Sequence, residues 1–196
     1  MVAQTAPTQQ AQIARWTISV TDYHRMHDVG ILGEDDRVEL IDGEVRQMSP
    51  IGALHAAIVT RYHTLLLPQV GKTAIVFVQN PIQLNNISEP QPDIALLRFR
   101  DDFYSAALPK AAEVLLIIEV SDSTLVYDRQ EKLPRYALAG IPEVWLTDVE
   151  SEAIERYTDP KGNQYATKQT LKRGQRISVQ ALPTITLNVD NIFGYG

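Results

Sequence analysis

The run VLLIIEV at Val114–Val120 constrains the fold more than any other part of the sequence. Neighbouring residues of a strand point to opposite faces of a sheet, so a strand that is apolar on both faces must be covered on both. The segment SDST and a helical stretch to about Ala139 follow, and Gly140 and Pro142 end this helix before an apolar segment at 143–148. Strand, helix and strand over this length predict a crossover between two parallel strands.

The rest of the chain supplies the other elements of an α/β fold. A helix is expected at Thr21–His27 with Ser19 or Thr21 as its cap, and Asp42-Gly43 predicts a tight hairpin. The remaining expected elements are a helix at 53–67, strands at 74–79, 81–84 and 93–97, and antiparallel strands within 153–187. Together they predict a mixed sheet flanked by helices, with added antiparallel strands at the C-terminus.

Composition excludes several classes of protein. The chain has 196 residues, 44% of them hydrophobic and 21% charged, which is typical of a globular domain; we expect one domain at 16–196 after a mobile tail at 1–15. The absence of cysteine excludes disulfides, thiolate zinc sites and a cysteine nucleophile. No apolar run approaches the roughly 18 residues of a membrane span, and the N-terminus lacks a secretory signal, so a cytoplasmic protein is expected. A net charge of −6 argues against non-specific coating of nucleic acid.

Two carboxylates are the first candidates for chemistry. Glu119 closes the most buried strand, where an unpaired carboxylate would cost several kcal/mol, so a cation, strong donors or water should surround it. Asp93 opens its own strand after Pro92, and if the two strands are antiparallel neighbours, the two side chains face a common point. Magnesium sites are built from such carboxylates, a backbone carbonyl and water, although a structural carboxylate that caps a turn or pairs with arginine is the commoner case.

A lysine on the following helix is the third candidate. Lys132 lies at the border of the helix face that carries Tyr136 and Gly140, from where its ammonium could reach the strand end at Glu119. A surface ion pair between Asp128 and Lys132, four residues apart, is an equally good interpretation. Pro134 should bend this helix because it cannot donate to the carbonyl of Gln130.

The histidines favour structural roles. His24 and His27 are three residues apart on the first helix, a spacing that can hold a metal, but without a third ligand in view an exposed pair is the better interpretation. His55 opens the second helix and could face the candidate site, although a hydrogen-bonded packing histidine is favoured.

These residues resemble a known arrangement. Pro92-Asp93, then about 25 residues, then Glu119-Val120-Ser121 is similar to the PD-(D/E)XK nuclease signature, with Ser121 where that signature has lysine. The strings VELIDGEV, QPDIALL, IIEVSDST and DRQEKLPRYALAGIPEVWLTD, spread over residues 17–148, resemble the Uma-type restriction-endonuclease-like family, bacterial proteins of largely unknown function.

The resemblance implies a fold and a set of site residues. The fold would be a restriction-endonuclease-like αβββαβ core with one site for Mg²⁺ or Mn²⁺. Asp93 and Glu119 would be metal ligands with the Val120 carbonyl as a third, and Lys132 would replace the lysine missing at Ser121. Glu39 matches an acidic residue that adds an outer metal contact in related nucleases. Glu44 and a merely exposed Glu39 remain alternatives.

The implied activity is Mg²⁺-dependent hydrolysis of DNA phosphodiester bonds by a metal-activated water, with DNA as the partner and no membrane. Two alternatives remain open. One is an inactive nuclease fold that binds nucleic acid or protein, and the other is a hydrolase of the same type that acts on RNA or a smaller phosphodiester. A homodimer is expected because two-fold dimers are the commonest oligomers and restriction-type enzymes often cut both strands as dimers.

Overall fold

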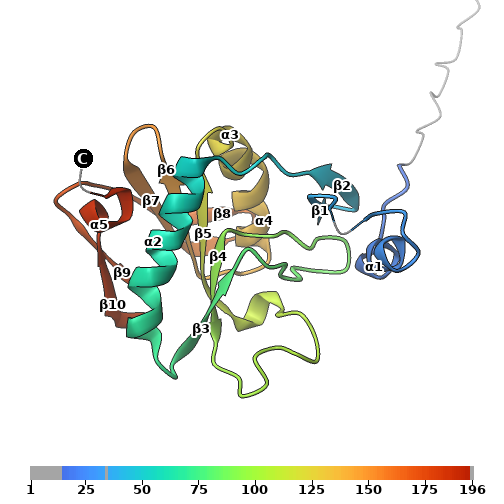
Figure 1. Ribbon diagram of the computed structural model, residues 1–196, viewed down its shortest axis with the longest axis horizontal. Coiled ribbons are helices and arrows are strands. Elements are labelled where there is room, and N and C mark those ends of the chain that lie inside the picture. Colours follow the sequence, from blue (N-terminus) through green and yellow to red (C-terminus); the bar gives the residue numbers. More distant parts are fainter. Residues whose placement is uncertain (1–14, 34, 195–196) are drawn as a thin grey trace, which may run out of the picture.

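A six-stranded mixed sheet forms the centre of the molecule, in a computed structural model that describes residues 15–33 and 35–194 (Figure 1). Its strands, in spatial order, are β3 (Ala74–Val78), β4 (Ile94–Arg98), β5 (Val114–Ser121), β6 (Glu143–Asp148), β7 (Ala153–Lys161) and β8 (Gln164–Lys172). β5 and β6 run parallel, and all other neighbours in this sheet are antiparallel. The predicted crossover and the predicted mixed sheet are therefore confirmed.

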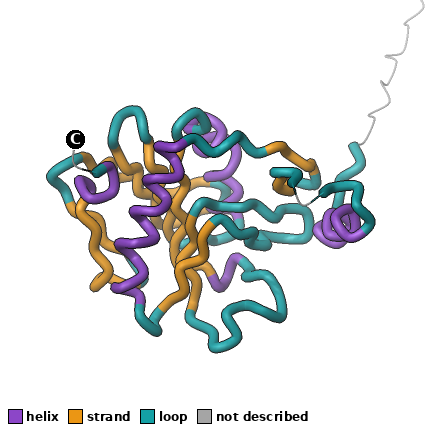
Figure 2. Tube along the Cα trace, viewed as in Figure 1, coloured by secondary structure: helices purple, strands orange, loops and turns teal. Residues whose placement is uncertain are grey.

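Helices cover both faces of the sheet, as the tube drawing also shows (Figure 2). One face carries α2 (Ala53–Val70), α5 (Val189–Phe193) and the antiparallel pair β9 (Arg176–Val179) and β10 (Leu182–Asn188). The other face carries α4 (Leu133–Leu138). The order α2, β3, β4, β5, α4, β6 is the αβββαβ core that the resemblance implies.

The central strand β5 connects the two halves of the core. All eight of its residues are buried, and from Leu116 to Val120 they alternate between the two covered faces, after an irregularity in the ladder near Leu115. Leu116 and Ile118 pack on the side of α2, while Ile117 packs on the side of α4 with Leu133 and Tyr136. Glu119 follows this alternation, so its side chain lies on the α4 side, where Tyr136 contacts it.

A smaller unit lies beside the sheet. It consists of α1 (Val20–Asp28) and the hairpin of β1 (Val38–Ile41) and β2 (Glu44–Gln47), which turns at the predicted Asp42-Gly43. Ser19 caps α1 by accepting a hydrogen bond from the Asp22 N–H at 3.1 Å, as one of the two predicted caps. Val20, Tyr23 and Leu40 form its small core. In Figure 1 this unit stands at the edge of the main body.

The helical crossover after β5 is not one regular helix. It contains α3 (Leu125–Tyr127), a π-helical turn η2 (Asp128–Lys132) and then α4. Within η2 the Leu133 N–H donates to the Asp128 carbonyl, five residues back. Pro134 follows at once and has no N–H for the carbonyl of Gln130, which is the irregularity expected from the sequence. A π-turn inserts one residue into the helical repeat and rotates the side chains that follow.

Two predicted elements differ from the structure. The second helix continues through Pro68 to Val70 because a proline near a helix end removes a single hydrogen bond, and Gly71, with φ 51°, ends it. The predicted strand at 81–84 is wrong. Its backbone bonds to the Pro90, Pro109 and Ser88 carbonyls in a folded loop, not to a neighbouring strand. A short 3-10 helix, η1 (Ala111–Glu113), leads into β5.

Part of the predicted domain organisation stays a prediction. Residues 1–14, most of the expected tail, lie outside the described residues. Within the described part of the chain, no helix is long and apolar enough to cross a bilayer.

Candidate functional site

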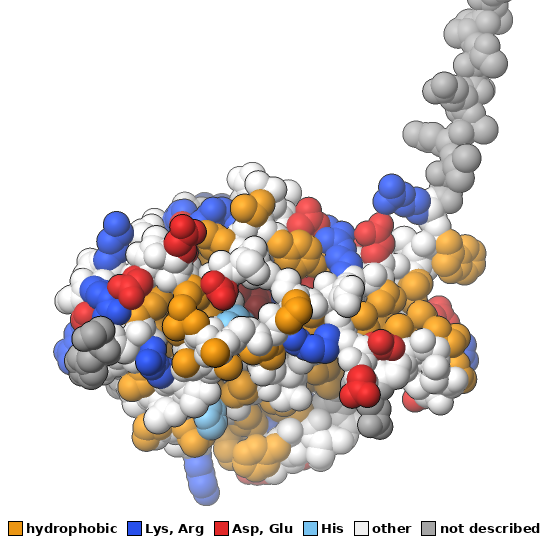
Figure 3. Space-filling view, turned by 45° about the horizontal axis from the view of Figure 1, so that its top comes forward, with side chains coloured by type: hydrophobic (Ala, Val, Ile, Leu, Met, Phe, Trp, Pro, Cys, Tyr) orange, Lys and Arg blue, Asp and Glu red, His pale blue; other side chains and the backbone are white. Residues whose placement is uncertain are grey.

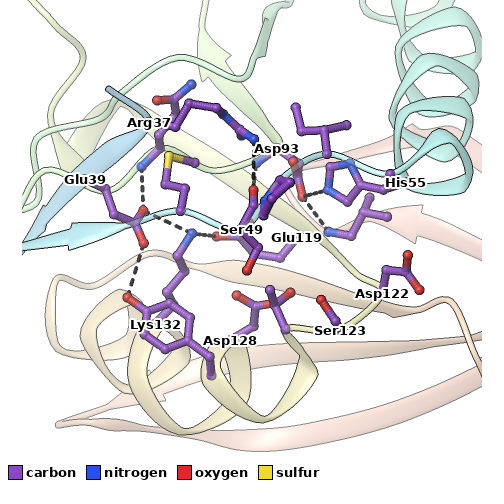
Figure 4. Close-up of a pocket in the computed structure, with 18 of the residues that line it drawn as sticks. Arg37, Glu39, Ser49, His55, Asp93, Glu119, Asp122, Ser123, Asp128 and Lys132 are labelled. Carbon is purple, nitrogen blue, oxygen red and sulfur yellow. Dashed lines mark hydrogen bonds and ion pairs between the residues drawn. The ribbon is translucent and has the colours of Figure 1, made fainter. Parts of the chain in front are cut away.

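A pocket of about 420 Å³ opens at the C-terminal end of β5 (Figure 4). Its walls come from the β1–β2 hairpin and the segment after it, the start of α2, the end of β5, and the α3–η2 crossover. Its ionisable lining residues are Arg37, Glu39, Arg46, His55, Asp93, Glu119, Asp122, Tyr127, Asp128 and Lys132. Four of them were predicted as site residues from the sequence.

The two predicted carboxylates meet at this strand end. The register pairs Ile94 with Ile118, so Asp93 and Glu119, one position further on, lie beside each other. The Asp93 N–H approaches Glu119 Oε2 at 3.4 Å, and the Val120 N–H donates to Asp93 Oδ2 at 2.8 Å. The two carboxyl groups line one pocket, as expected for strands that are antiparallel neighbours.

His55 belongs to this site. Its Nε2 lies 3.0 Å from Asp93 Oδ2, the same oxygen that accepts from Val120, and Gln79 Nε2 donates to the other oxygen at 3.3 Å. The favoured interpretation, a hydrogen-bonded histidine, is correct, and its partner is a candidate ligand. Among the described residues, His55 Nδ1 is the one buried side-chain polar atom without a hydrogen bond.

Lys132 lies between two buried carboxylates. Its Nζ is 3.1 Å from Glu39 Oε2 and 3.3 Å from Glu119 Oε1, and the residue is only 6% exposed. The alternative surface pair with Asp128 is wrong, because Asp128 is buried and its Oδ2 accepts from the Ser121 and Thr124 hydroxyls instead. Regular α-helical spacing predicted that pair, and the π-turn at 128–132 breaks that spacing.

Glu39 and Glu44 differ in their position along the hairpin: Glu39 pairs with Arg46 at the pocket, whereas Glu44 pairs with Ile41 beside the turn. Glu39 is 3% exposed and faces the pocket, where the Tyr127 hydroxyl donates to Oε1 at 3.2 Å and the Gln91 N–H to Oε2 at 3.1 Å. Glu44 is exposed and pairs with Arg46. Glu39 is therefore the acidic residue of the ELIDGE string that lies in the pocket.

Burial dominates the electrostatics of Glu119. It raises the pKa of the Glu119 carboxyl from 4.5 to about 8, against the opposing effect of the Lys132 ammonium, while Asp128 and Asp93 raise it further. The Tyr136 hydroxyl donates to Glu119 Oε1 at 2.6 Å. Burial lowers the pKa of Lys132, but the charges of Glu119 and Glu39 outweigh it, and the pKa of Lys132 is raised. Lys132 is therefore a permanent cation near neutral pH.

The donor set fits a hard divalent cation. Asp93, Glu119 and the Val120 carbonyl offer oxygen atoms. Burial raises the pKa of Glu119 even with Lys132 nearby, so a further cation would stabilise its ionised form. Over the described residues there is no cluster of three or more His, Cys, Asp or Glu side chains that could hold a metal. A magnesium ion here would therefore depend on two carboxylates, a backbone carbonyl and water, a common arrangement for Mg²⁺.

The other histidine pair does not form a metal site. His24 Nε2 lies 2.9 Å from Oε1 of the buried Glu89, whereas His27 is exposed. The sequence predicted a partly exposed surface pair, and both histidines are exposed. The hydrogen bond of His24 to a distant residue could not be read from helical spacing.

Several site residues were missed by the sequence analysis. Tyr127 and Tyr136 hydrogen-bond to Glu39 and Glu119, but aromatic residues at helical spacing predict a core position equally well. Arg37, at the mouth of the pocket, precedes a strand and has no signal of its own. On the face over α3, the start of α2 and the β1–β2 hairpin, acidic, basic and hydrophobic side chains are interspersed, with no single basic field (Figure 3).

Comparisons with known proteins place the chain in a family and a fold. The model of the family Uma2, described as "Putative restriction endonuclease", matches residues 20–190. The solved structures include one described as "a putative nuclease belonging to DUF820 from Anabaena variabilis ATCC 29413". It has 16% sequence identity and a TM-score of 0.72, and the match covers 90% of this chain and 97% of that one. At this identity the likeness shows the fold alone. No curated protein matches the chain.

Proposed function

This chain belongs to the Uma2 family and has a nuclease-like fold, and from this premise we propose that it is a magnesium-dependent endonuclease that hydrolyses DNA phosphodiester bonds. One observation carries the proposal. Asp93 and Glu119 converge in a pocket whose buried cation, Lys132, contacts Glu119. That combination provides two oxygen ligands for a metal beside a fixed positive charge, which suits an anionic transition state.

The proposed metal would be held by Asp93, Glu119 and the Val120 carbonyl. When bound, Mg²⁺ or Mn²⁺ would lower the pKa of a coordinated water and offset charge on the scissile phosphate.

The side chains around these ligands fix them before any metal arrives. His55 Nε2 and the Val120 N–H both contact Asp93 Oδ2, so the other oxygen, which has one weak contact at 3.3 Å, is the better placed to bind. The Tyr136 hydroxyl and Lys132 both engage Glu119 Oε1, which leaves Oε2 with a single long contact at 3.4 Å. Each carboxylate thus has one anchored oxygen and one available oxygen.

Lys132 acts as a donor and not as a base. Its raised pKa keeps the ammonium charged, so its N–H groups can orient the attacking water and stabilise charge that develops on the phosphoryl oxygens. Glu39 anchors the ammonium from the hairpin side at 3.1 Å. The β1–β2 hairpin thus helps to place the lysine that Ser121 cannot supply.

A plasmid-nicking assay tests the proposal. We expect wild-type protein to nick supercoiled DNA with Mg²⁺ or Mn²⁺ and to be inactive in EDTA, and Asp93→Asn to be inactive with either metal. Glu150→Gln, a change in the exposed turn after β6, is the matched control and should behave as wild type. RNA and bis(p-nitrophenyl) phosphate as substrates test the other phosphodiesters. No cleavage of any of them would leave the fold as a binding module and refute the proposal.

We further propose a homodimer, because two-fold dimers are the commonest oligomers and two such sites would let the protein cut both strands of a duplex, and we keep the cytoplasm as the expected location. Light scattering at high protein concentration tests the dimer, and a monomer there would refute it.

A further inference from the structure

The arginines that line the pocket differ in one respect. Arg46 pairs with Glu131 at 2.9 Å and with Glu44 at 3.3 Å, so its charge is neutralised and it pins the hairpin to the crossover. Arg37, just before β1, has no carboxylate within ion-pair distance among the described residues. Its side chain donates from Nη1 to the Ser49 carbonyl at 2.9 Å. Among the residues that the structure describes, Arg37 therefore brings to the pocket a positive charge that is not ion-paired.

The hydrogen bond to the Ser49 carbonyl positions the Arg37 guanidinium but does not neutralise its charge. A guanidinium has five N–H donors in a planar fork, and one hydrogen bond to a carbonyl leaves most of them free. Arg37 and Ser49 lie side by side at the open end of the β1–β2 hairpin, where the Met48 N–H donates to the Arg37 carbonyl, and Figure 4 shows the contact of the Arg37 side chain with Ser49. Arg37 is exposed and Lys132 is buried, so the two cations lie at the mouth and at the floor of one pocket.

A pocket with this charge arrangement suits a substrate with more than one phosphate. Glu39, Asp93, Glu119 and Asp128 make the interior acidic, and the cation at the mouth offers the forked geometry that phosphate oxygens accept. The chain has a net charge of −6 and no large basic field on this face, so one well-placed arginine would contribute a large share of substrate attraction.

We propose that Arg37 binds a backbone phosphate next to the scissile one, so that the substrate is a nucleic acid strand that continues past the site of cleavage. This inference rests on the proposed function, because it assumes phosphodiester hydrolysis at Asp93 and Glu119. Arg37 is a binding residue here, and it does not touch the reacting atoms.

A comparison of two substrates tests the inference. Arg37→Gln should lower kcat/KM for a DNA oligonucleotide by about tenfold, the value of one charge-assisted hydrogen-bonded pair, mostly through KM. It should leave the hydrolysis of bis(p-nitrophenyl) phosphate, which has a single phosphate, unchanged. Arg37→Lys should keep part of the effect because it keeps the charge but loses the fork. Arg25→Gln, the same charge change on exposed α1, is the control and should match wild type on both substrates.

Salt dependence gives a second measurement. The slope of log KM against log salt concentration for the oligonucleotide should become smaller by about one for Arg37→Gln and stay unchanged for Arg25→Gln. Equal losses on both substrates would overturn the inference, because they would show a structural or a scissile-phosphate role. An Arg37→Gln variant that cleaves oligonucleotide as well as wild type would also overturn it, with the proposed function intact. Failure of the wild-type protein to cleave either substrate would refute the proposed function and this inference with it.

Discussion

The buried carboxyl of Glu119 should make the metal-free protein less stable as pH rises. Its pKa is about 8 in the folded chain and 4.5 as its ordinary value, so the folded state holds a proton that the unfolded state releases. The free energy of unfolding therefore falls with rising pH across this window, by up to about 1.4 kcal/mol per pH unit and at most about 5 kcal/mol in all. Lys132 adds nothing to this trend, because it is charged in both states over the same range.

Glu119→Gln isolates this effect. The amide cannot ionise, so the variant should lack the part of the pH slope that Glu119 causes. Glu89, whose pKa burial also raises, contributes equally to both proteins and cancels in the difference, whereas Asp128, whose charge raises the pKa of Glu119, titrates together with it and belongs to the measured effect. The amide group would also meet the Asp93 N–H as donor against donor, a cost of about 1 kcal/mol that shifts the whole curve without changing its slope.

Urea unfolding followed by circular dichroism, in EDTA at half-unit steps from pH 5 to pH 8.5, measures both proteins. We expect the difference between Glu119→Gln and wild type to grow in favour of the variant by about 1 kcal/mol per pH unit in the middle of the range. Glu150→Gln, at an exposed position, should run parallel to wild type. A difference between Glu119→Gln and wild type that is constant across the whole range would refute the reasoning.

Three further predictions follow from the same site. Magnesium should raise the melting temperature of wild type more at pH 8 than at pH 5, because it competes with the proton on Glu119, and should not raise that of Asp93→Asn; differential scanning fluorimetry measures this. Lys132→Ala should destabilise the fold by about 3–5 kcal/mol in urea, because it leaves Glu39 and Glu119 buried without their cation, and should lower cleavage by about 10²–10³. His55→Ala should weaken magnesium binding by about tenfold, because His55 orients the candidate ligand Asp93 and loss of such a partner costs at least that much affinity. Calorimetry measures this, and Leu54→Ala, on the exposed side of the same turn, is the control that should bind magnesium as wild type does.

The stability cost expected for Lys132→Ala differs from what the helix pattern alone suggests. A lysine at the border of a helix face should tolerate alanine at little cost to the fold. In the structure the same lysine is buried and ion-paired with residues from β1 and β5, 93 and 13 positions away. 

The DNA cleavage assay with Lys132→Ala should therefore be run well below the melting temperature of this variant. A loss of cleavage can then be assigned to the missing ammonium and not to unfolding.

The fold could be predicted where the local sequence pattern and the tertiary packing favour the same secondary structure. A run that is apolar on both faces has to be a central strand, and β5 is that strand. The loop at 81–84 shows where such prediction fails. Ile82 is fully buried, but it lies in a folded loop and not in the sheet, and a short apolar pattern looks the same in both cases. The cause of the raised pKa of Glu119 was likewise only half predictable. The sequence already places Glu119 at the end of the most buried strand, and burial is the largest cause, whereas the contributions of Lys132, Asp128 and Asp93 depend on the complete fold.

The position of Lys132 shows why the site needed the structure. In a regular helix, residues four apart share a face, and this rule pairs Lys132 with Asp128. Pro134 could be read as a bend, but the sequence does not say that the strain is absorbed one turn earlier, as a π-turn that ends at Lys132. With this turn, Asp128 accepts hydrogen bonds from the Ser121 and Thr124 hydroxyls, which hold the start of the crossover against the end of β5. The Lys132 ammonium then reaches Glu119 on the same strand. Ser121 thus stands where the nuclease signature has lysine and helps to anchor the helical turn that carries its replacement. It follows that Ser121→Ala should disturb the placement of Lys132 and not merely remove a neutral hydroxyl.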